Sequence, residues 1–380
     1  MTSASLSASH LHYRSPQRTG SPLQRTAIPV TTVSPTPPPA PAEPLDLRDV
    51  IKVVPAHCRQ SNPTRSWGLV ARDVVVWIAS LVGLALTDTW WLVVPLWALA
   101  GLAVSAMFVI AHDATHQALF PDRKTNDRVA RWLMVPSQHI KQSWALGHNH
   151  IHHNHTARQG MDFVWHPVSP TEYQAMGRIG RLRHRLEWSM LGAGVYYMRA
   201  VWWEKMVRLT EPPAKWVDSI GSDRKWLARV TMVIVVAMSA LGWAMYGNPM
   251  GSVWLVFKLL VVPMVLFMWV IGFTVYLHHI SPDLRWATRR GWTKVRGQLD
   301  STTVLRVPIL VRPFFHSIFI HVPHHVDPRI PCYHLDEAAR HIADAFPGRV
   351  VDEKLTLRRY LANTRACKLY DFDTQEWSTY

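Results

Sequence analysis

Four stretches of the chain are almost wholly apolar, and segments rich in lysine and arginine separate them. They cover residues 69–86, 91–111, 230–246 and 253–277. The second holds 21 uncharged residues, enough for a helix that rises about 1.5 Å per residue to cross the hydrocarbon core of a bilayer. Lys258 near the start of the fourth stretch can snorkel, and neighbouring helices can satisfy the carbonyl that Pro263 leaves free. We therefore predict four transmembrane helices.

The charge distribution predicts how these helices are oriented. Residues 87–90 and 247–252, which join the helices in pairs, contain a single charged residue, Asp88. Residues 113–225 contain 16 lysines and arginines, and residues 281–380 contain another 15. Because cytosolic segments of membrane proteins carry the excess of basic residues, we expect two hairpins in the membrane, with both termini and the central loop in the cytosol. The predicted fold class is an all-α integral membrane protein with a cytosolic helical cap.

Two segments do not follow the pattern of spanning helices. Residues 1–44 hold nine of the 27 prolines among many serines and threonines. Such a composition buries too little apolar surface to fold, so we expect a disordered tail before a membrane domain of residues 45–380. The tail lacks the apolar core of a secretory signal. Residues 186–203 mix apolar and aromatic side chains with flanking arginines, which favours helices lying at the membrane surface over an ordinary soluble helix pair.

Composition agrees with a membrane protein and excludes several kinds of site. Hydrophobic residues make up 48% and charged residues 18%, the latter below the value of about 25% for soluble chains. The three cysteines, Cys58, Cys332 and Cys367, are too few and too far apart for a disulfide framework, a four-cysteine zinc site or a four-cysteine iron–sulfur cluster. The chain has 21 histidines but only 10 tyrosines.

The histidines gather next to the predicted membrane helices, on the side assigned to the cytosol. Residues four apart share a face of a helix, so two rings at this spacing can point the same way. A lone pair of this kind is more often structural, and a histidine run alone is typical of a low-complexity metal-binding tract. Topology, however, brings every group to one membrane face, so we predict a metal centre. The groups are His112 and His116; His148, His150, His152, His153 and His155; His278 and His279; and His321, His324 and His325.

The number and type of these residues narrow down the metal. Imidazole suits iron, copper, zinc and nickel alike, but eight or nine histidines exceed the needs of one ion, so two ions are implied. No thiolate lies within the groups, which disfavours copper(I) and iron–sulfur chemistry. The Glu-x-x-His pair of soluble di-iron proteins does not occur in the sequence. A dimetal centre of this kind at a membrane surface is suited to oxidising an apolar substrate with O2.

The order and spacing of the groups resemble the integral-membrane fatty acid desaturases and their hydroxylase relatives, over about residues 65–370. That family carries three histidine boxes on the cytosolic side of paired transmembrane hairpins. Here the boxes are His112-Asp-Ala-Thr-His116, His148-Asn-His-Ile-His152-His153 and His321-Val-Pro-His324-His325. Finer similarities favour the bacterial omega-6, or delta-12, acyl-lipid branch, and they lie in residues 162–167, 274–279, 328–333 and 364–371.

The resemblance implies a centre of two iron ions with O2 as co-substrate. The reaction would remove two hydrogens from adjacent methylenes of a fatty acyl chain and leave a cis double bond. The family's additional histidine after the fourth helix maps to His279, with His278 as the competing choice. The implied ligands are His112, His116, His148, His152, His153, His279, His321, His324 and His325.

Residues around the implied ligands include candidate hydrogen-bond acceptors and further histidines. Asp113, Asp162 and Asn149 are candidate acceptors for the outer nitrogens of the ligand rings. The extra histidines His150 and His155 interrupt the second box, so the choice of ligands within it is open. His316 lies close to the third box, at a position where relatives often carry a histidine.

The resemblance also implies partners and leaves alternatives. The substrate would be a fatty acyl lipid or acyl thioester at a bacterial cytoplasmic membrane. A separate ferredoxin or b-type cytochrome would supply electrons, because the sequence contains no redox module of its own. The net charge of +15 suits an acidic redox protein, anionic headgroups or a thioester carrier, and no nucleic-acid partner is expected. A hydroxylase, epoxygenase or carotenoid ketolase on the same scaffold is the nearest alternative. A metal transporter is an alternative of another class, disfavoured because the histidines lie outside the bilayer.

Overall fold

The computed structural model describes residues 45–380, so the disordered tail predicted for residues 1–44 lies outside the described residues. Within this part of the chain, four helical runs are long and apolar enough to cross a membrane, which confirms the four predicted spans. The fourth run is a series of three helical segments. The runs are α2 (Pro63–Leu86), α3 (Trp90–Thr115), α10 (Val217–Tyr246), and the series α11 (Pro249–Val256), η5 (Phe257–Val261) and α12 (Val262–His279).

Capping residues, rather than hydropathy, set the ends of these helices. α2 starts ahead of its apolar stretch because the Asn62 side chain accepts a hydrogen bond from the Arg65 amide, and Pro63 suits the first helical position. α10 ends where Gly247 takes a left-handed conformation with φ of 69°, which glycine adopts without strain. α3 continues beyond its apolar stretch to Thr115, so the first histidine box lies on the last turn of a membrane helix.

Close backbone contacts hold two elements against α12. A β-carbon on Gly101 of α3 would lie 2.7 Å from the β-carbon of Leu266 in α12. A β-carbon on Gly272 of α12 would lie 2.4 Å from the carbonyl oxygen of Ala193, in the short helix α9. Only glycine allows backbones to approach this closely. Both contacts therefore position α3 and α9 against the helix that ends in His279.

Short helices and two small sheets form the rest of the described chain. The helices before the second hairpin are α1 (Leu47–Lys52), η1 (Ala56–Arg59), α4 (Arg123–Leu133), α5 (Lys141–Ala145), η2 (Leu146–His152), α6 (His153–His155), α7 (Pro170–Ala175), α8 (Arg178–Glu187), α9 (Ala193–Tyr196), η3 (Tyr197–Val207) and η4 (Ala214–Trp216). Those after it are η6 (Arg296–Asp300), α13 (Arg312–Phe315), α14 (His321–Val326), η7 (Cys332–His334), α15 (Leu335–Ala345) and α16 (Leu357–Ala366).

The two sheets are the main departure from an all-helical fold. β1 (Thr303–Arg306) pairs in parallel with β2 (Val351–Lys354). β3 (Leu369–Asp371) pairs antiparallel with β4 (Glu376–Ser378). Each sheet has only two strands, so the predicted helical fold class is confirmed with these small additions.

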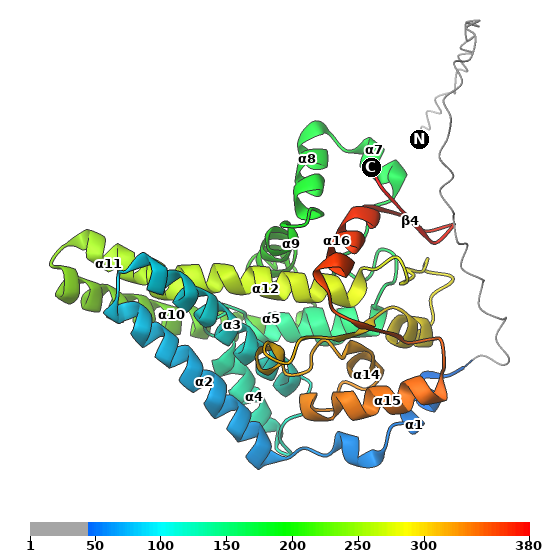
Figure 1. The fold of residues 1–380 in the computed structure, drawn as a ribbon, viewed down its shortest axis with the longest axis horizontal. Coiled ribbons are helices and arrows are strands. Elements are labelled where there is room, and N and C mark those ends of the chain that lie inside the picture. Colours follow the sequence, from blue (N-terminus) through cyan, green and yellow to red (C-terminus); the bar gives the residue numbers. More distant parts are fainter. Residues whose placement is uncertain (1–44) are drawn as a thin grey trace, which may run out of the picture. The chain divides into compact units, whose positions relative to one another are not determined.

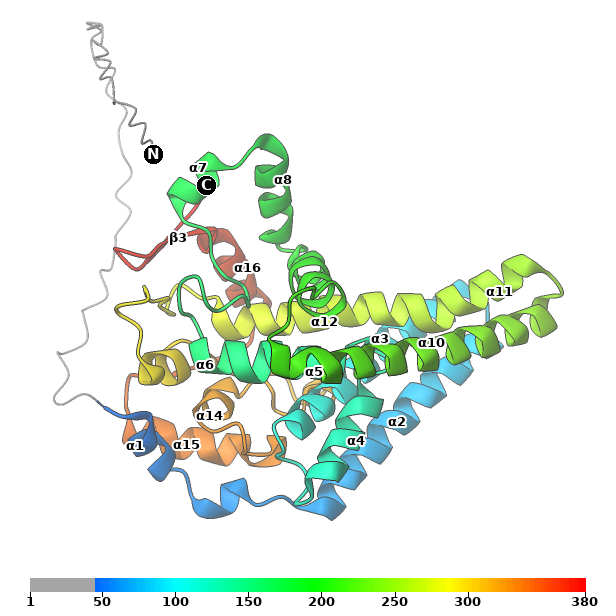
Figure 2. The same cartoon turned by 180° about the vertical axis from the view of Figure 1, so that it is seen from behind.

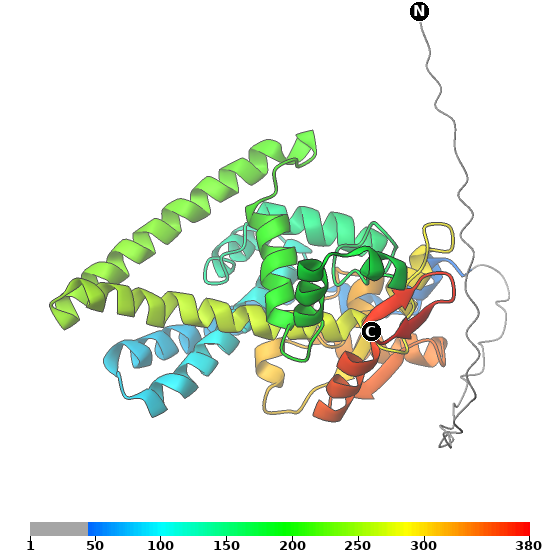
Figure 3. The same ribbon diagram turned by 90° about the horizontal axis from the view of Figure 1, so that it is seen from above.

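The tips of the two hairpins lie at one end of the membrane helices, and the histidine-bearing elements lie at the other (Figures 1 and 3). Figures 1 and 2 both place the run of α5, η2 and α6 between α12 and α14. We call this end of the helices the histidine end. The predicted hairpins thus lead every histidine box to one place, as the topology required.

The segment predicted to lie at the membrane surface is helical. Residues 186–203 form the end of α8, a turn, α9 and most of η3. In Figure 1, α8 extends across the direction of α12. It exposes a row of apolar side chains that includes Ile179, Leu182 and Leu186. The location of these helices at a membrane surface stays a prediction.

A buried lysine joins the two hairpins near their tips. Lys258 lies in η5, a π-helical segment, and its side chain is fully buried. Its ammonium donates hydrogen bonds to Asp88 Oδ1 at 2.6 Å and to the Thr87 carbonyl at 3.1 Å, both in the link between α2 and α3. Trp254 donates to the same Asp88 oxygen. The charge expected to snorkel is instead neutralised by a partner from the other hairpin.

The two sides of this ion pair should differ in importance for stability. Asp88→Ala leaves a fully buried ammonium without its carboxylate, so we expect it to lower the free energy of unfolding by about 3 kcal/mol. Lys258→Met should cost less, because the Asp88 side chain is 51% exposed and water can solvate it. Thermal unfolding of the two variants in the same detergent, monitored by circular dichroism, shows which variant loses more stability. A larger loss in Lys258→Met than in Asp88→Ala would contradict this account.

Candidate metal centre

The histidine end of the described chain brings ten buried or half-buried histidines together from five elements. α3 and its C-cap supply His112 and His116, and α12 ends with His278 and His279. η2 and α6 supply His148, His152 and His153. α14 supplies His321, His324 and His325. All nine predicted ligands therefore lie together, with His278 beside them.

Five of these rings form a first group. Their ligand nitrogens lie within 4.8 Å of one another. The Nε2 atom of His148 lies 3.0 Å from Nε2 of His112 and 3.1 Å from Nε2 of His153. His153 Nε2 in turn lies 3.1 Å from His324 Nε2. The group consists of His112, His116, His148, His153 and His324.

Four further rings form a second group beside the first. The ligand nitrogens of His152, His279 and His325 lie within 4.8 Å of one another. His321 joins them through its Nε2 atom, which lies 3.1 Å from Nε2 of His325. The second group therefore consists of His152, His279, His321 and His325.

A π-helix divides the second histidine box between the groups. η2 is a π-helix, in which hydrogen bonds run from residue i to residue i+5. This wider turn brings His148 and His153, five residues apart, onto one side, with their Nε2 atoms 3.1 Å apart. His152 then points to the second group. An α-helix would instead place His148 and His152, four residues apart, on a shared face.

Every ring of the second group donates its Nδ1 proton outward. His152 donates to Asp162 at 2.9 Å and His325 donates to Gln298 Oε1 at 2.9 Å. His321 donates to the Ile318 carbonyl at 3.1 Å, and His279 donates to the Ser301 carbonyl at 3.4 Å. A neutral imidazole that donates through Nδ1 carries its lone pair on Nε2. The Nε2 lone pairs of this group are therefore free for a metal ion.

The first group contains a similar outward contact and several ring nitrogens with no partner. His112 donates from Nδ1 to Asp113 Oδ1 at 2.9 Å, and Asp113 Oδ2 accepts from the Cys332 amide. His116 Nε2, His153 Nδ1 and His324 Nδ1 are buried without a hydrogen-bond partner in the described part of the chain. Buried polar atoms normally have partners. The donor set of both groups therefore fits bound metal ions.

Electrostatics favour neutral rings at this place. Burial, followed by the charge of neighbouring imidazoles, lowers the pKa of His116, His148, His153, His324 and His325 well below the usual value. Burial raises the pKa of Asp162, whereas the His152 ring, the His279 ring and the Val164 amide lower it. Together they leave the pKa below its usual value. Neutral imidazole is the form that binds metal, so these rings are in the binding form near neutral pH.

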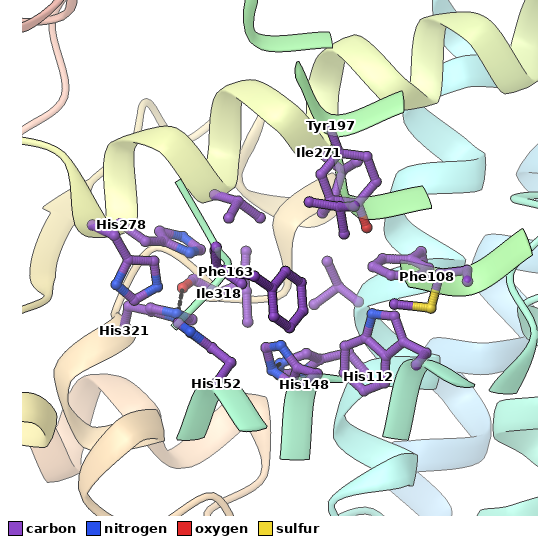
Figure 4. A pocket seen from close by; sticks show the side chains of 17 residues that line it. Phe108, His112, His148, His152, Phe163, Tyr197, Ile271, His278, Ile318 and His321 are labelled. Carbon is purple, nitrogen blue, oxygen red and sulfur yellow. Dashed lines mark hydrogen bonds between the residues drawn. The ribbon is translucent and has the colours of Figure 1, made fainter. Parts of the chain in front are cut away.

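A narrow pocket adjoins both groups. It encloses about 50 Å³, and its lining includes five rings from the two groups and His278. Figure 4 shows Phe108, Phe163, Tyr197, Ile271 and Ile318 around the histidines. The Trp144 ring stacks on His148, with centroids 4.2 Å apart. The pocket therefore presents apolar surface on most sides and imidazole on one. The histidines that line it are His112, His148, His152, His278, His279 and His321.

The histidines whose roles were open lie in different surroundings. His150 packs against Trp216 and His155 against Trp292, both outside the two groups. His316 lies in a buried contact with Asp73 of α2, with Nε2 2.6 Å from the carboxylate. His278 stacks on His321 with ring centroids 3.7 Å apart.

Two of the three candidate acceptors accept a hydrogen bond from a predicted ligand ring, and the third does not. Asp113 and Asp162 accept imidazole protons, as described above, whereas the Asn149 amide donates to the Thr115 carbonyl at 3.0 Å. Two residues that contact histidines were not predicted from the sequence. Gln298 accepts from His325 and donates to the His153 carbonyl at 2.6 Å. Tyr197 donates to His139 Nε2 at 3.1 Å. Burial lowers the pKa of His139 to about 4. Neither residue belongs to a motif, so no sequence signal was present.

Comparisons with known proteins agree with this geometry. The family model described as fatty acid desaturase matches residues 89–353. An sn-1 oleoyl-lipid 12-desaturase of Anabaena variabilis is 28% identical over 337 residues, which cover 87% of this chain and 91% of that protein. A second sn-1 oleoyl-lipid 12-desaturase, from Picosynechococcus, is 27% identical over 86% of this chain and 90% of its own length. An endoplasmic-reticulum omega-3 fatty acid desaturase of Nicotiana tabacum is 30% identical over 80% of this chain and 78% of its own length.

The family match runs from the start of the second membrane helix to β2, and it includes every histidine of both groups. The chain belongs to the fatty acid desaturase family.

Proposed function

We propose that this enzyme introduces a cis double bond at the delta-12 position of an acyl chain carried by a membrane lipid. One observation supports this most strongly: a narrow apolar pocket has rings of both histidine groups in its wall. An unactivated methylene has no polar handle, so shape must hold it next to the reacting centre. The delta-12 position and the lipid carrier rest on the names of the cyanobacterial relatives.

The proposed centre holds two iron ions. The five rings of the first group would bind one ion and the four rings of the second group the other, which accounts for all nine predicted ligands. Bound iron would supply the activation of O2. The protein's own contribution is to keep the rings neutral, to point their lone pairs inward, and to exclude water from the acyl pocket.

Several residues would position the substrate. Phe108, Phe163 and Ile318 line the pocket beside the rings and would press a straight acyl segment against them. Tyr197 also lines the pocket, and its hydroxyl is engaged by His139. It therefore presents ring carbons to the substrate instead of a free hydroxyl.

The orientation and electron supply form part of the proposal. The basic segments would place the histidine end at the cytosolic face of a bacterial inner membrane. Removing two hydrogens from the acyl chain with one O2 requires two electrons and two protons from outside and releases two water molecules. A ferredoxin or a b-type cytochrome would deliver these electrons one at a time.

Analysis of the lipid product tests the reaction itself. In a bacterial host that makes monounsaturated but no diunsaturated acids, expression should yield a new diunsaturated acid whose second double bond lies at delta-12, as shown by gas chromatography–mass spectrometry. The His324→Ala variant, which lacks a first-group ring, should give none at an equal protein level. A hydroxylated or epoxidised product in the wild type would show that the enzyme performs the related oxygen insertion.

The outer carboxylates should control metal affinity. Asp162→Asn removes a charge that fixes the tautomer of His152, so we expect iron affinity to fall by 10–100-fold. Iron retained by purified protein after dialysis against a graded chelator series measures this. Asp223→Asn serves as the control, because Asp223 is a buried carboxylate that contacts Arg131 and the Gln142 amide instead of a histidine. Equal iron loss in both variants would contradict the assignment.

The two adjacent histidines at the end of α12 should behave differently. His279 donates from Nδ1 to Ser301, and its ligand nitrogen lies within 4.8 Å of those of His152 and His325. His278 has no such contact with His152 or His325; it clusters with His279 and His321 and stacks on the His321 ring. His279→Ala should therefore abolish the unsaturated product and lower bound iron. His278→Ala should retain a measurable fraction of both. The reverse order, in product and in iron content per chain, would make His278 the ligand.

A further inference from the structure

A cluster of cations lies on the surface next to the second histidine group. It consists of Arg158, Arg289, Arg290 and Lys294, and we call it the basic patch. Arg289, Arg290 and Lys294 are exposed. Among residues 45–380, none of the four lies within 4 Å of a carboxylate.

The acidic residues that flank this loop are already neutralised. Asp283 pairs with Arg359, and Asp300 pairs with Arg349. The other two cations of the loop, Arg285 and Arg296, donate hydrogen bonds to Gln375 in the β3–β4 turn. The four cations of the basic patch therefore form no ion pair within residues 45–380, a feature that favours an anionic partner.

Two segments distant in sequence combine to build this surface. Arg158 and Ala287 form an isolated β-bridge, and the Ala287 amide donates to the Ala157 carbonyl at 3.0 Å. The Arg158 guanidinium lies over the Trp292 ring at 5.2 Å. The Arg289 guanidinium lies close to Gly160. Trp292, which is half-buried, therefore lies beside Arg158 of the basic patch.

A short series of hydrogen-bonded contacts leads inward from Trp292. Its indole N–H donates to the Thr156 carbonyl at 2.8 Å. The Thr156 hydroxyl oxygen lies 3.2 Å from Nδ1 of His325, a ring of the second group. Electron tunnelling weakens steeply with distance and with gaps between atoms. A path through one residue between a surface indole and a ligand ring is therefore an effective route.

In the predicted orientation of the helices, the position of the loop separates it from membrane lipid. The chain from α12 to η6 extends beyond the histidine end, on the side away from the hairpin tips (Figures 1 and 2). The attraction of a lipid surface for cations falls off within about one Debye length, about 8 Å at physiological salt. A soluble protein reaches this face more readily than lipid headgroups do.

We propose that the basic patch docks an acidic one-electron carrier protein, and that the Trp292–Thr156–His325 contacts form the entry route for electrons. This docking proposal rests on the proposed function, because the carrier is needed to supply the two electrons that O2-dependent desaturation takes from outside. Each docking event oxidises the carrier by one electron and reduces the centre by one. Two events complete the two electrons that one O2 and one pair of acyl hydrogens require.

Charge removal tests the docking surface. In the triple variant Arg289→Gln, Arg290→Gln, Lys294→Gln we expect the KM for the carrier to rise at least 10-fold at low ionic strength, and the salt dependence of the rate to flatten. The probes are a reduced [2Fe–2S] ferredoxin and the reduced soluble domain of a b-type cytochrome, each with its reductase. The matched control is Arg123→Gln, Lys124→Gln, Arg128→Gln on α4, three exposed cations elsewhere. An unchanged carrier KM in the patch variant, or an equal rise in the control, would overturn the proposal.

A chemical reductant separates docking from folding. With dithionite and a viologen mediator, the patch variant should form product in a single turnover as the wild type does, and its iron content should be unchanged. Loss of activity with this reductant would make the three residues structural and overturn the proposal. Loss of binding to vesicles of anionic phospholipid with carrier KM unchanged would assign the patch to lipid, which also overturns it.

The route has its own test. Trp292→Phe keeps the surface charge but removes the hydrogen bond to Thr156, so the carrier KM should stay constant while the first-order rate of electron transfer from the bound reduced carrier falls several-fold. An unchanged rate would remove Trp292 from the route. Carrier binding to the wild type, measured by surface plasmon resonance without substrate, distinguishes a failure of the docking surface from a failure of the proposed function. Binding that the patch variant lacks supports the docking surface even where no desaturated lipid is formed.

Discussion

Nine imidazoles are packed together here with no carboxylate inside either group, and the need to satisfy their ring nitrogens shapes the histidine end. A neutral ring has one N–H and one lone pair, so a ring that turns its lone pair inward needs an acceptor for its outward proton. Asp113, Asp162, Gln298 and the carbonyls of Ile318 and Ser301 supply acceptors to five of the nine rings. They come from separate segments of the chain. Apart from Asp113, which neighbours His112 on α3, these acceptors lie in η6 and in the loops around the membrane bundle, so segments that carry no ligand ring help to orient the rings.

The sequence could predict the membrane helices and the meeting of the histidines. Apolar stretches of sufficient length permit few structures other than spanning helices, and the basic segments indicate which helix ends belong together. Once α3 and α12 end on the same side, His112 and His279 must lie near each other. The expectation of two metal ions followed from counting rings, whereas iron and desaturation followed from the resemblance to the family. The capping residues Asn62 and Asn248 account for helix starts that hydropathy alone misplaced.

The division of the nine rings into five and four could not be predicted, because it depends on backbone geometry within one short segment. An α-helical spacing pairs His148 with His152, whereas the π-helix of η2 pairs His148 with His153. Gln298 was missed for a related reason: its partners are 145 and 27 residues away, and a single glutamine has no motif. Lys258 was expected to snorkel, but only the packed structure shows Asp88 of the other hairpin beside it.

The π-helix at the second box has a consequence for how this segment can evolve. A π-turn differs from an α-turn by one residue, so loss of a single residue from η2 would restore the α-helical repeat and rotate His153 away from its group. Point substitutions at outward positions such as His150 leave this register intact. Insertions and deletions within the box should therefore be purged far more strongly than replacements. In this chain the length of the second box is thus a structural requirement of its own, separate from the identity of its histidines.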